Sequence, residues 1–311
     1  MNGLGPHGLN GLFVVLNDSK IIFYDTSDSP TLQNEALEIS DAYFKRSYVN
    51  DLIPVQYKSR VHPLGLNYEL YAGSLNRYEV ARFVFRKHLL HDFPKELCVR
   101  IAELLSLSFL PTVVNMASPP INNQDPQVLF MARAWDPSGE GIELSAEQKV
   151  ERREINETRA RCINLLRKEF GSRFYGGFAR TAYAMDNYGH LLLGDALVSG
   201  KKNYIALLRQ YPICIATTGL HGSIGWKMAE YVAFSKAIVS EKLRSEVPGN
   251  FDNGANYFEF CTPEECLQET TKLFESRELR FKMMQTNWVY YKSYLAPDQL
   301  IMRTLSIASQ S

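Results

Sequence analysis

A lysine and a glutamate, Lys227 and Glu230, lie three residues apart directly after a glycine-rich segment that contains Gly219, Gly222 and Gly225. Glycines let the backbone come close to a ligand, and the N–H groups at the start of a helix favour an anion such as phosphate. Residues three apart share a helix face. Lysine supplies a point charge for phosphate, and an ionised carboxylate accepts hydrogen bonds from the two hydroxyls of a ribose. The spacing therefore predicts a site for a nucleotide or a nucleotide-sugar.

This spacing also has a plainer interpretation, which is the stronger one on spacing alone. Lys and Glu three apart on an exposed helix form a solvated pair worth roughly 0.2–0.5 kcal/mol. Two other phosphate motifs are not matched. A Walker loop needs Gly-Lys-Ser/Thr in sequence, but Trp226 separates Gly225 from Lys227, and the segment FYGGFA does not give the G-x-G-x-x-G of a dinucleotide site. Neither a P-loop nucleoside triphosphatase nor a classical dehydrogenase is indicated.

Extended and helical patterns alternate along the second half of the chain. Strands are expected at 128–135, 173–179, 212–219, 236–240 and 256–260, and helices at 147–171, 202–211, 226–234 and 262–276. Such alternation is typical of a parallel, doubly wound sheet. In that fold, ligands bind beyond the carboxyl ends of the strands and near helix N-termini, which is where the glycine-rich loop falls.

The first half has a different pattern. Short extended runs precede two amphipathic helices, and a segment rich in proline and asparagine follows them as a predicted linker. The runs are 12–17, 20–25, 41–49 and 53–66, the helices 77–93 and 95–110, and the linker 115–127. The chain is therefore expected to divide into units at 1–120 and 121–285, with C-terminal helices at 286–311 that pack back on the first unit.

The composition excludes several classes of protein. Lys plus Arg and Asp plus Glu both number 34 in 311 residues, so the basic excess of a general nucleic-acid binder is missing. Five scattered cysteines indicate neither a disulfide framework nor a zinc site. Neither an apolar run of about 18 residues nor a signal peptide is found. We expect a cytoplasmic protein, an expectation that leaves room for peripheral contact at the inner membrane face and leaves the oligomeric state open.

The segment GSIGWKMAEYVAFSKAIVS, 222–240, resembles the K-x-x-E-Y-x-A-x-x-K-x-I-V segment of nucleotide-sugar-dependent glycosyltransferases of the GT-B architecture, group 1-like. The resemblance implies that Glu230 holds the donor ribose. It places the preceding loop, with His221, Gly222 and Ser223, against the donor diphosphate, and Lys227 beside it. Many retaining members carry a glutamate where this chain has Gly222, so the anomeric outcome stays open.

Other segments fit the same template, in order, over roughly 125–310. VLFMARAW resembles the first strand of the C-terminal domain of the family, where an arginine meets the diphosphate, and Arg133 takes that position. FGSRFYGGFAR resembles the second strand and its glycine turn, with Gly176 and Gly177. The lysine that follows the arginine in the family is missing here, and Lys201 and Lys202 are candidates for the second cation.

The resemblance implies an α/β fold of two Rossmann-like, doubly wound domains with C-terminal helices closing the chain. It implies that residues 1–120 form an acceptor-side domain, which is shortened or lacks its start. It also implies that residues 121–285 form the donor-binding domain. The catalytic base would come from the first domain, where His62 or Asp28 could take a proton from a sugar hydroxyl. The plainer interpretations are a structural histidine and a turn-capping aspartate, and these are favoured on the residues alone.

The expected activity is transfer of a sugar from a nucleoside diphosphate sugar to a hydroxyl of a glycan, polysaccharide or lipid-linked acceptor. The donor is a co-substrate, and neither a metal ion nor a further cofactor is expected. One alternative is a catalytically degenerate nucleotide- or glycan-binding module of the same fold. A further alternative is an enzyme on an unrelated nucleotide-binding sheet.

Overall fold

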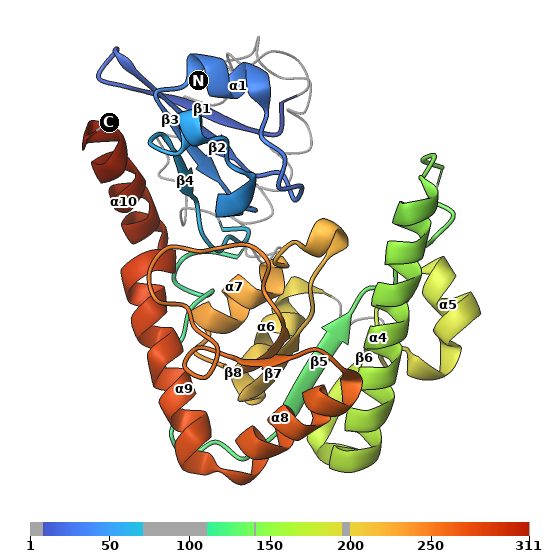
Figure 1. The fold of residues 1–311 in the computed structure, drawn as a ribbon. Helices are drawn as coiled ribbons and strands as arrows, with labels where there is room; N and C mark the ends of the chain where they lie inside the picture. Colours follow the sequence, from blue (N-terminus) through green and yellow to red (C-terminus); the bar gives the residue numbers. More distant parts are fainter. Residues whose placement is uncertain (1–8, 71–110, 140, 195–199, 311) are drawn as a thin grey trace, which may run out of the picture.

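The computed structural model describes residues 9–70, 111–139, 141–194 and 200–310, which form two α/β units and a set of C-terminal helices (Figure 1). The helices predicted at 77–93 and 95–110 lie outside the described residues. Within these ranges the predicted fold class, α/β with two sheets followed by closing helices, is confirmed.

The first sheet has four strands in the order β1-β2-β3-β4. β1 and β2 form an antiparallel hairpin, and β2, β3 and β4 run parallel. The hairpin turns at Asn17 and Asp18, which both have positive φ, a conformation that these two residue types tolerate. The elements are β1 (Gly11–Leu16), β2 (Lys20–Asp25), α1 (Asn34–Ile39), β3 (Ala42–Lys45) and β4 (Val61–Pro63).

The second sheet has five parallel strands in the order β6-β5-β7-β8-β9. After β5 the chain adds β6 on one side and then returns to add β7 on the other, so the sheet is doubly wound, as predicted. Its strands are β5 (Val128–Ala132), β6 (Phe174–Phe178), β7 (Ile213–Ala216), β8 (Ala237–Glu241) and β9 (Phe258–Phe260). Its helices are α4 (Ala146–Phe170), α5 (Ala182–Tyr188), α6 (Lys201–Gln210), α7 (Trp226–Ala233) and α8 (Pro263–Glu275).

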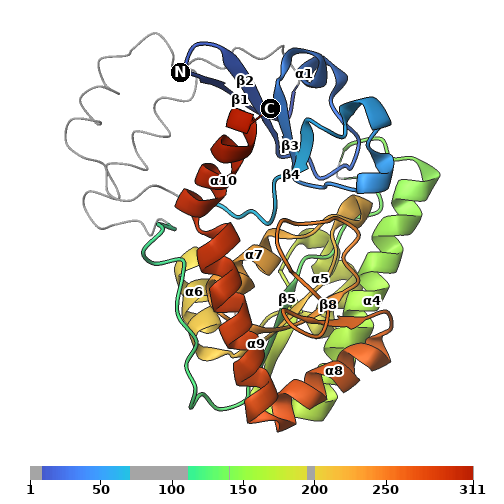
Figure 2. The ribbon, with the colours of Figure 1, turned by 60° about the vertical axis from the view of Figure 1, so that its left-hand side comes forward.

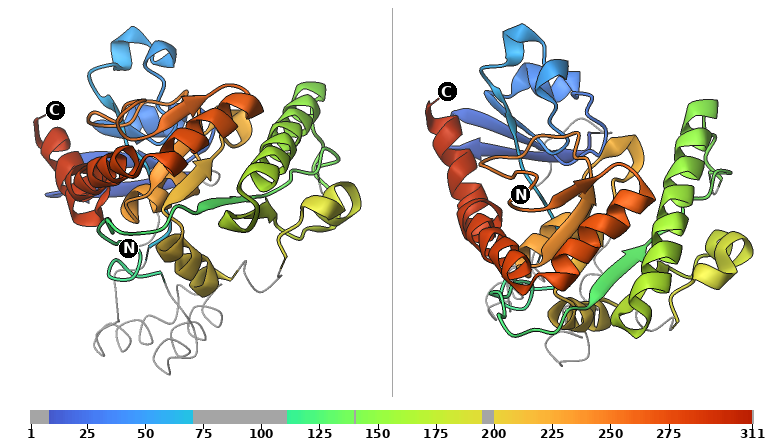
Figure 3. Two further views of the ribbon diagram at one scale, coloured as in Figure 1. Left: turned by 90° about the horizontal axis from the view of Figure 1, so that it is seen from below. Right: turned by 60° about the horizontal axis from the view of Figure 1, so that its bottom comes forward.

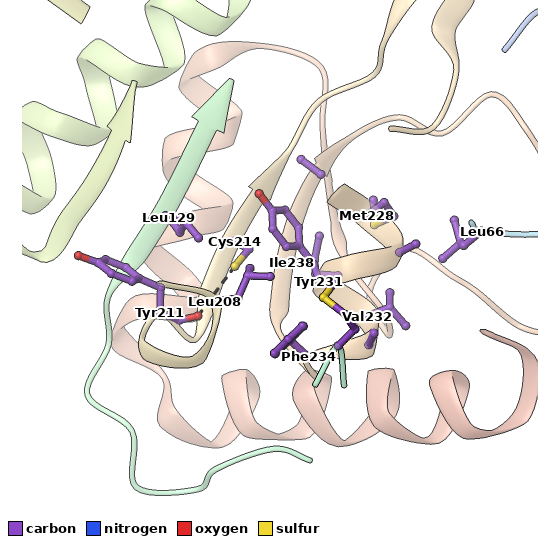
Figure 4. Close-up of a cluster of buried hydrophobic side chains, with 14 of the residues drawn as sticks. Leu66, Leu129, Leu208, Tyr211, Cys214, Met228, Tyr231, Val232, Phe234 and Ile238 are labelled. Carbon is purple, nitrogen blue, oxygen red and sulfur yellow. Dashed lines mark hydrogen bonds between the residues drawn. The ribbon is translucent and has the colours of Figure 1, made fainter. Parts of the chain in front are cut away.

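Each face of this sheet packs on its own layer of helices. Leu129 of β5, Cys214 of β7 and Ile238 of β8 face α6 and α7 in one buried cluster (Figure 4). Neighbouring strand residues such as Val128 and Phe130 point the other way, toward α4 and α8, which lie side by side on that face (Figure 3). Strands that are buried on both faces have continuous apolar runs in their sequence, and these runs predicted the parallel sheet.

The C-terminal helices return to the first sheet. From α9 (Arg277–Tyr290) the chain passes through a π-helical turn, Tyr291–Leu295, into α10 (Pro297–Gln310), which lies along the first unit (Figure 2). Arg303 donates to the carbonyl of Leu64 at 2.7 Å, and Tyr24 and Thr304 share a hydrogen bond of 2.8 Å. These contacts hold the first unit against the helices of the second.

The two units also touch beside the glycine-rich loop. The Nη2 atom of Arg46, just after β3, donates to the carbonyl of Ile224 at 2.9 Å. Nearby, the N–H of Glu246 donates to the carbonyl of Tyr48 at 2.8 Å. Residues that follow β3 are therefore in direct contact with residues that precede α7 and follow β8.

A buried ion pair lies at the carboxyl ends of β2 and β3. Asp25 and Lys45 are both 0% exposed, and Nζ and Oδ2 are 2.8 Å apart. Tyr43 donates its hydroxyl to the same oxygen, and the N–H of Ser27 donates to Oδ1 at 2.9 Å. Burial lowers the pKa of Lys45, and the Asp25 charge opposes that shift. The pair thus fixes the ends of the strands that carry Arg46.

We expect Asp25→Leu to destabilise the protein by about 3–5 kcal/mol, because it leaves Lys45 buried without an ion partner. The double variant Asp25→Leu/Lys45→Met removes both charges and should be clearly more stable than the single variant. Urea unfolding followed by circular dichroism measures both, with Glu38→Ala, an exposed change on α1, as control. A double variant no more stable than Asp25→Leu would contradict this account.

Candidate functional site

A cavity of about 760 Å³, measured out to the solvent at its mouth, lies at the carboxyl ends of β5, β7 and β8. The ends of β5 and β7 are the point where the strand order reverses, which is where doubly wound sheets bind ligands. Among the described residues that line the cavity there is no aspartate or glutamate, whereas three are cationic. Its walls include Met131, Ala132, Arg133, Trp135, Arg159, Thr217, Thr218, Gly219, Ile224, Gly225, Trp226 and Lys227.

Helix α7 begins at the cavity. Its N-cap is Gly225, with extended backbone angles, and among the described residues no side chain caps the helix. A Cβ at Gly225 would meet its first neighbour, the carbonyl of Thr217, only at 3.8 Å, so the protein's own packing does not require a glycine here. A glycine at this position suits close approach of a ligand to the positive end of the helix.

This cavity is lined by two of the residues that the sequence analysis predicts to bind the donor. Lys227, in the first turn of α7, donates from Nζ to the carbonyl of Met131. Burial lowers the pKa of Lys227 to about 8, while the nearby Glu230 charge raises it. Arg133 follows β5 and is exposed, with its guanidinium carbon 4.8 Å from the ring centroid of Trp135. Both cations thus lie at the same end of the sheet as the α7 N-terminus.

Glu230 is buried, which excludes the solvated pair with Lys227. It is 4% exposed, and its Oε1 accepts from Lys201 Nζ at 2.6 Å. Its Oε2 accepts from the hydroxyl of Tyr204 at 2.7 Å, and burial keeps the pKa of that hydroxyl well above its ordinary value. Lys201, a candidate second cation, is therefore bound to Glu230 instead. Glu230 is not among the cavity-lining residues, although it lies one turn beyond Lys227.

The remaining predicted glycines and loop residues are not among those lining the cavity. A Cβ at Gly176 would lie 2.5 Å from the carbonyl oxygen of Phe130, and one at Gly177 the same distance from that of Leu191. These two glycines are therefore explained by close packing around β6. A role for them at the donor stays a prediction.

The loop between β7 and α7 folds on itself. His221 and Gly222 have positive φ, and the N–H of His221 donates to Glu151 on α4 at 2.6 Å. Ser223 is buried, and its carbonyl accepts from the N–H of Gly219 at 2.8 Å. Gly219, Ile224 and Gly225 line the cavity in this loop, whereas His221, Gly222 and Ser223 stay candidates by position.

The two candidate bases have different surroundings. Asp28 is exposed and pairs with Arg46, which also holds the carbonyl of Ile224, so Asp28 lies near the loop that lines the cavity. His62 packs on Phe44, with ring centroids 5.6 Å apart. Burial and the charge of Arg303 on α10 lower the pKa of His62. Of the two, the structure brings Asp28 toward the cavity and leaves His62 beside α10.

One cavity residue was missed by the sequence. Arg159 of α4 is 6% exposed and donates from Nε to Thr217 Oγ1 at 2.9 Å, from Nη1 to the carbonyl of Arg133 at 2.6 Å and from Nη2 to the carbonyl of Thr218 at 2.8 Å. Asn156, one turn earlier, bonds both the N–H and the carbonyl of Trp135. Their phase was a usable signal, because Asn156 and Arg159 continue the helix face that carries Ile163, Leu166 and Phe170, and polar residues on an apolar face are unusual.

Among the described residues, no group of three or more His, Cys, Asp or Glu side chains is placed to hold a metal ion. No described helix is both long enough and apolar enough to span a bilayer.

No protein-family model and no curated protein sequence matches this chain. Among solved structures, a glycosyltransferase from Rickettsia africae is similar at 13% identity, over 96% of this chain and 68% of that one, with a TM-score of 0.46. Anabaena Alr3699/HepE, solved in complex with UDP and glucose, is similar at 10% identity over 89% of this chain and 64% of that one, with a TM-score of 0.43. The C-terminal domain of a group 1 glycosyl transferase (LpcC) from Francisella tularensis is similar at 13% identity, over 58% of this chain and 97% of that domain, with a TM-score of 0.39.

The chain therefore spans about two thirds of the length of the two longer proteins. The observed layout, two α/β sheets with C-terminal helices that return to the first, is the one that the GT-B resemblance implies.

We expect Lys227 to give the cavity a distinct pH dependence. Its pKa is about 8 in the folded chain, against an ordinary value of 10.5 in the unfolded one, so the unfolded state binds more protons between these values. The free energy of unfolding should therefore rise with pH over this range, and Lys227→Met should remove part of that rise. Charges of Glu230, Arg159 and Lys201 act on Lys227, and these remain in the variant.

The measurement is urea unfolding from pH 7 to pH 10, with the exposed Lys202→Met as control. The comparison is between variants because burial also lowers the pKa of Lys236 to about 8. Wild-type and Lys227→Met stabilities that run parallel over the whole range would contradict the expectation.

Proposed function

We propose that this chain is a glycosyltransferase that moves a sugar from a nucleoside diphosphate sugar to an acceptor hydroxyl. The observation that carries the proposal is the cavity at the switch point of the second sheet, which has cationic walls, no described carboxylate and the N-terminus of α7. Such a site suits a compact polyanion, and the diphosphate of an activated sugar is one.

Each step of the proposed reaction has candidate residues in this structure. Arg133, Lys227 and the backbone at the start of α7 would offset the charge that develops on the leaving diphosphate. Glu230 would accept hydrogen bonds from the ribose diol. An ionised carboxylate has about four acceptor positions, and Lys201 and Tyr204 occupy two of them. Two positions, one on each oxygen, match the two hydroxyls of a diol.

The acceptor would approach from the first unit. Asp28 is the better of the two candidate bases, because Arg46 joins it to the loop at Ile224. A base must lie within hydrogen-bond reach of the hydroxyl that it deprotonates, and His62 lies beside α10 instead. A glycan, polysaccharide or lipid-linked hydroxyl would serve as acceptor. The proposed reaction uses neither a metal ion nor a cofactor besides the donor, and takes place in the cytoplasm or at the inner membrane face.

A second candidate function is a nucleotide- or glycan-binding module that no longer transfers sugar. The ion pair between Lys201 and Glu230 favours it, because a ligand diol has to fit beside an existing partner. Glycine at position 222, where many retaining relatives have a glutamate, favours it too. Turnover separates the two functions, since a module binds the donor without hydrolysing or transferring it.

We expect nucleoside diphosphates and their sugars to raise the melting temperature, with about 2.7 kcal/mol of stabilisation at 100 times the dissociation constant. Glu230→Gln should weaken nucleoside diphosphate binding by roughly tenfold, since it exchanges a charged acceptor for a neutral amide. Thermal shift with a panel of nucleotides measures the first, and calorimetric titration the second.

Glu154→Gln, an exposed change on α4, serves as the matched control. Inorganic pyrophosphate, which has no ribose, should lose no affinity in Glu230→Gln, because the change removes a negative charge that acts on Lys227. If no nucleotide moves the melting temperature, the proposed function fails. If nucleotides bind but donor hydrolysis and transfer stay undetectable with a range of sugars, the binding module is the better account.

A further inference from the structure

Helix α4 places a buried cation in the wall of the cavity. Arg159 is 6% exposed and is one of the cavity-lining residues. Its three nitrogens each donate to an atom at the end of β5 or β7, namely the hydroxyl of Thr217 and the carbonyls of Arg133 and Thr218. The guanidinium is therefore fixed in orientation by the strand ends themselves.

None of these partners carries the opposite charge. Over the described parts of the chain, no carboxylate forms an ion pair with Arg159. The Glu241 charge attracts it, but that carboxylate accepts from the N–H and hydroxyl of Thr218 at 2.6 and 2.7 Å. Burial lowers the pKa of Arg159 to about 10, so it stays protonated at neutral pH. A buried cation without an ion partner is costly unless an anion joins it.

The same guanidinium keeps donors for a ligand. Arginine has five N–H donors in a planar fork, and the three bonds above use three of them. The two that remain belong to a group that borders the cavity. One N–H remains on each of the two terminal nitrogens, so the fixed guanidinium can still donate to more than one phosphate oxygen.

We propose that Arg159 binds the anionic ligand of this cavity directly, and that the ligand presents a diphosphate or a similarly compact polyoxyanion. The inference rests on the proposed function for the position of the diphosphate, but it requires no sugar transfer. It also supplies the second cation that the sequence did not provide after Arg133. Because Arg159 joins the ends of β5 and β7, ligand binding and the alignment of these strands are then coupled.

Calorimetric titration with inorganic pyrophosphate tests this directly. We expect Arg159→Gln to weaken binding at least tenfold and Arg159→Lys to weaken it severalfold, since lysine keeps the charge but loses the fork. Arg153→Gln, exposed on the same helix, should bind as wild type does. The titrations are repeated at several salt concentrations, because a direct charge contact makes binding salt-dependent. Loss of Arg159 should reduce that dependence, whereas a residue that only braces the strands would leave it unchanged.

Cooperative urea unfolding shows whether each variant is folded. If Arg159→Gln does not fold, Arg159→Lys decides the question. The inference is overturned if wild type does not bind pyrophosphate at millimolar concentration, or if the folded Arg159 variants bind it within twofold of wild type. If pyrophosphate binding depends on Arg159 but nucleotide sugars have no effect, the role of Arg159 is supported and the proposed transferase function is contradicted. If sugar transfer occurs and is unchanged in the Arg159 variants, the transferase function is supported and the role of Arg159 is contradicted.

Discussion

Positive charge buried where the strand order of the second sheet reverses is the constraint on which the rest of the structure depends. Lys227 and Arg159 approach this point from α7 and α4, on opposite faces of the sheet. Each is held by backbone carbonyls, so geometry is fixed but the charge is not neutralised. Carbonyl dipoles offset part of the cost of burying these charges, and an anion in the cavity would offset more of it. On the proposed function, a bound diphosphate would therefore stabilise the folded chain.

The first unit contributes to this site through a short chain of contacts. The buried pair of Asp25 and Lys45 fixes the ends of β2 and β3, and Arg46 follows directly after β3. From there Arg46 reaches the carbonyl of Ile224, one residue before the N-cap of α7. A charge buried in one unit thus orients a contact on the loop of the other.

The sequence predicted the fold well because its signals were local. Apolar runs marked the parallel strands, and helix α8 began at Thr262 and Pro263 as its capping residues indicated. Lys227 and Arg133 were found at the cavity because loops after strand ends are where a doubly wound sheet binds its ligands. The partners of Glu230 were not found, since Lys201 and Tyr204 are some 26 to 29 residues away in sequence and meet it through packing of α6 on α7. Arg159 was missed for the same reason, and the surroundings of His62 depend on α10, far along the chain.

The balance between an enzyme and a binding module turns on how Glu230 is held. A carboxylate fixed by Lys201 and Tyr204 cannot rotate freely, and fixed acceptors lose less entropy when a ligand binds. The same ion partner withdraws part of the charge that a ribose would otherwise meet. The fixed geometry raises the affinity for a ribose, and the loss of charge lowers it. Neither effect changes the geometry of the site, because one acceptor position stays open on each oxygen of Glu230. Sugar transfer depends on the placing of the donor more than on the tightness of its binding. A rigid Glu230 beside a cationic cavity therefore fits a transferase at least as well as a module that only retains nucleotide.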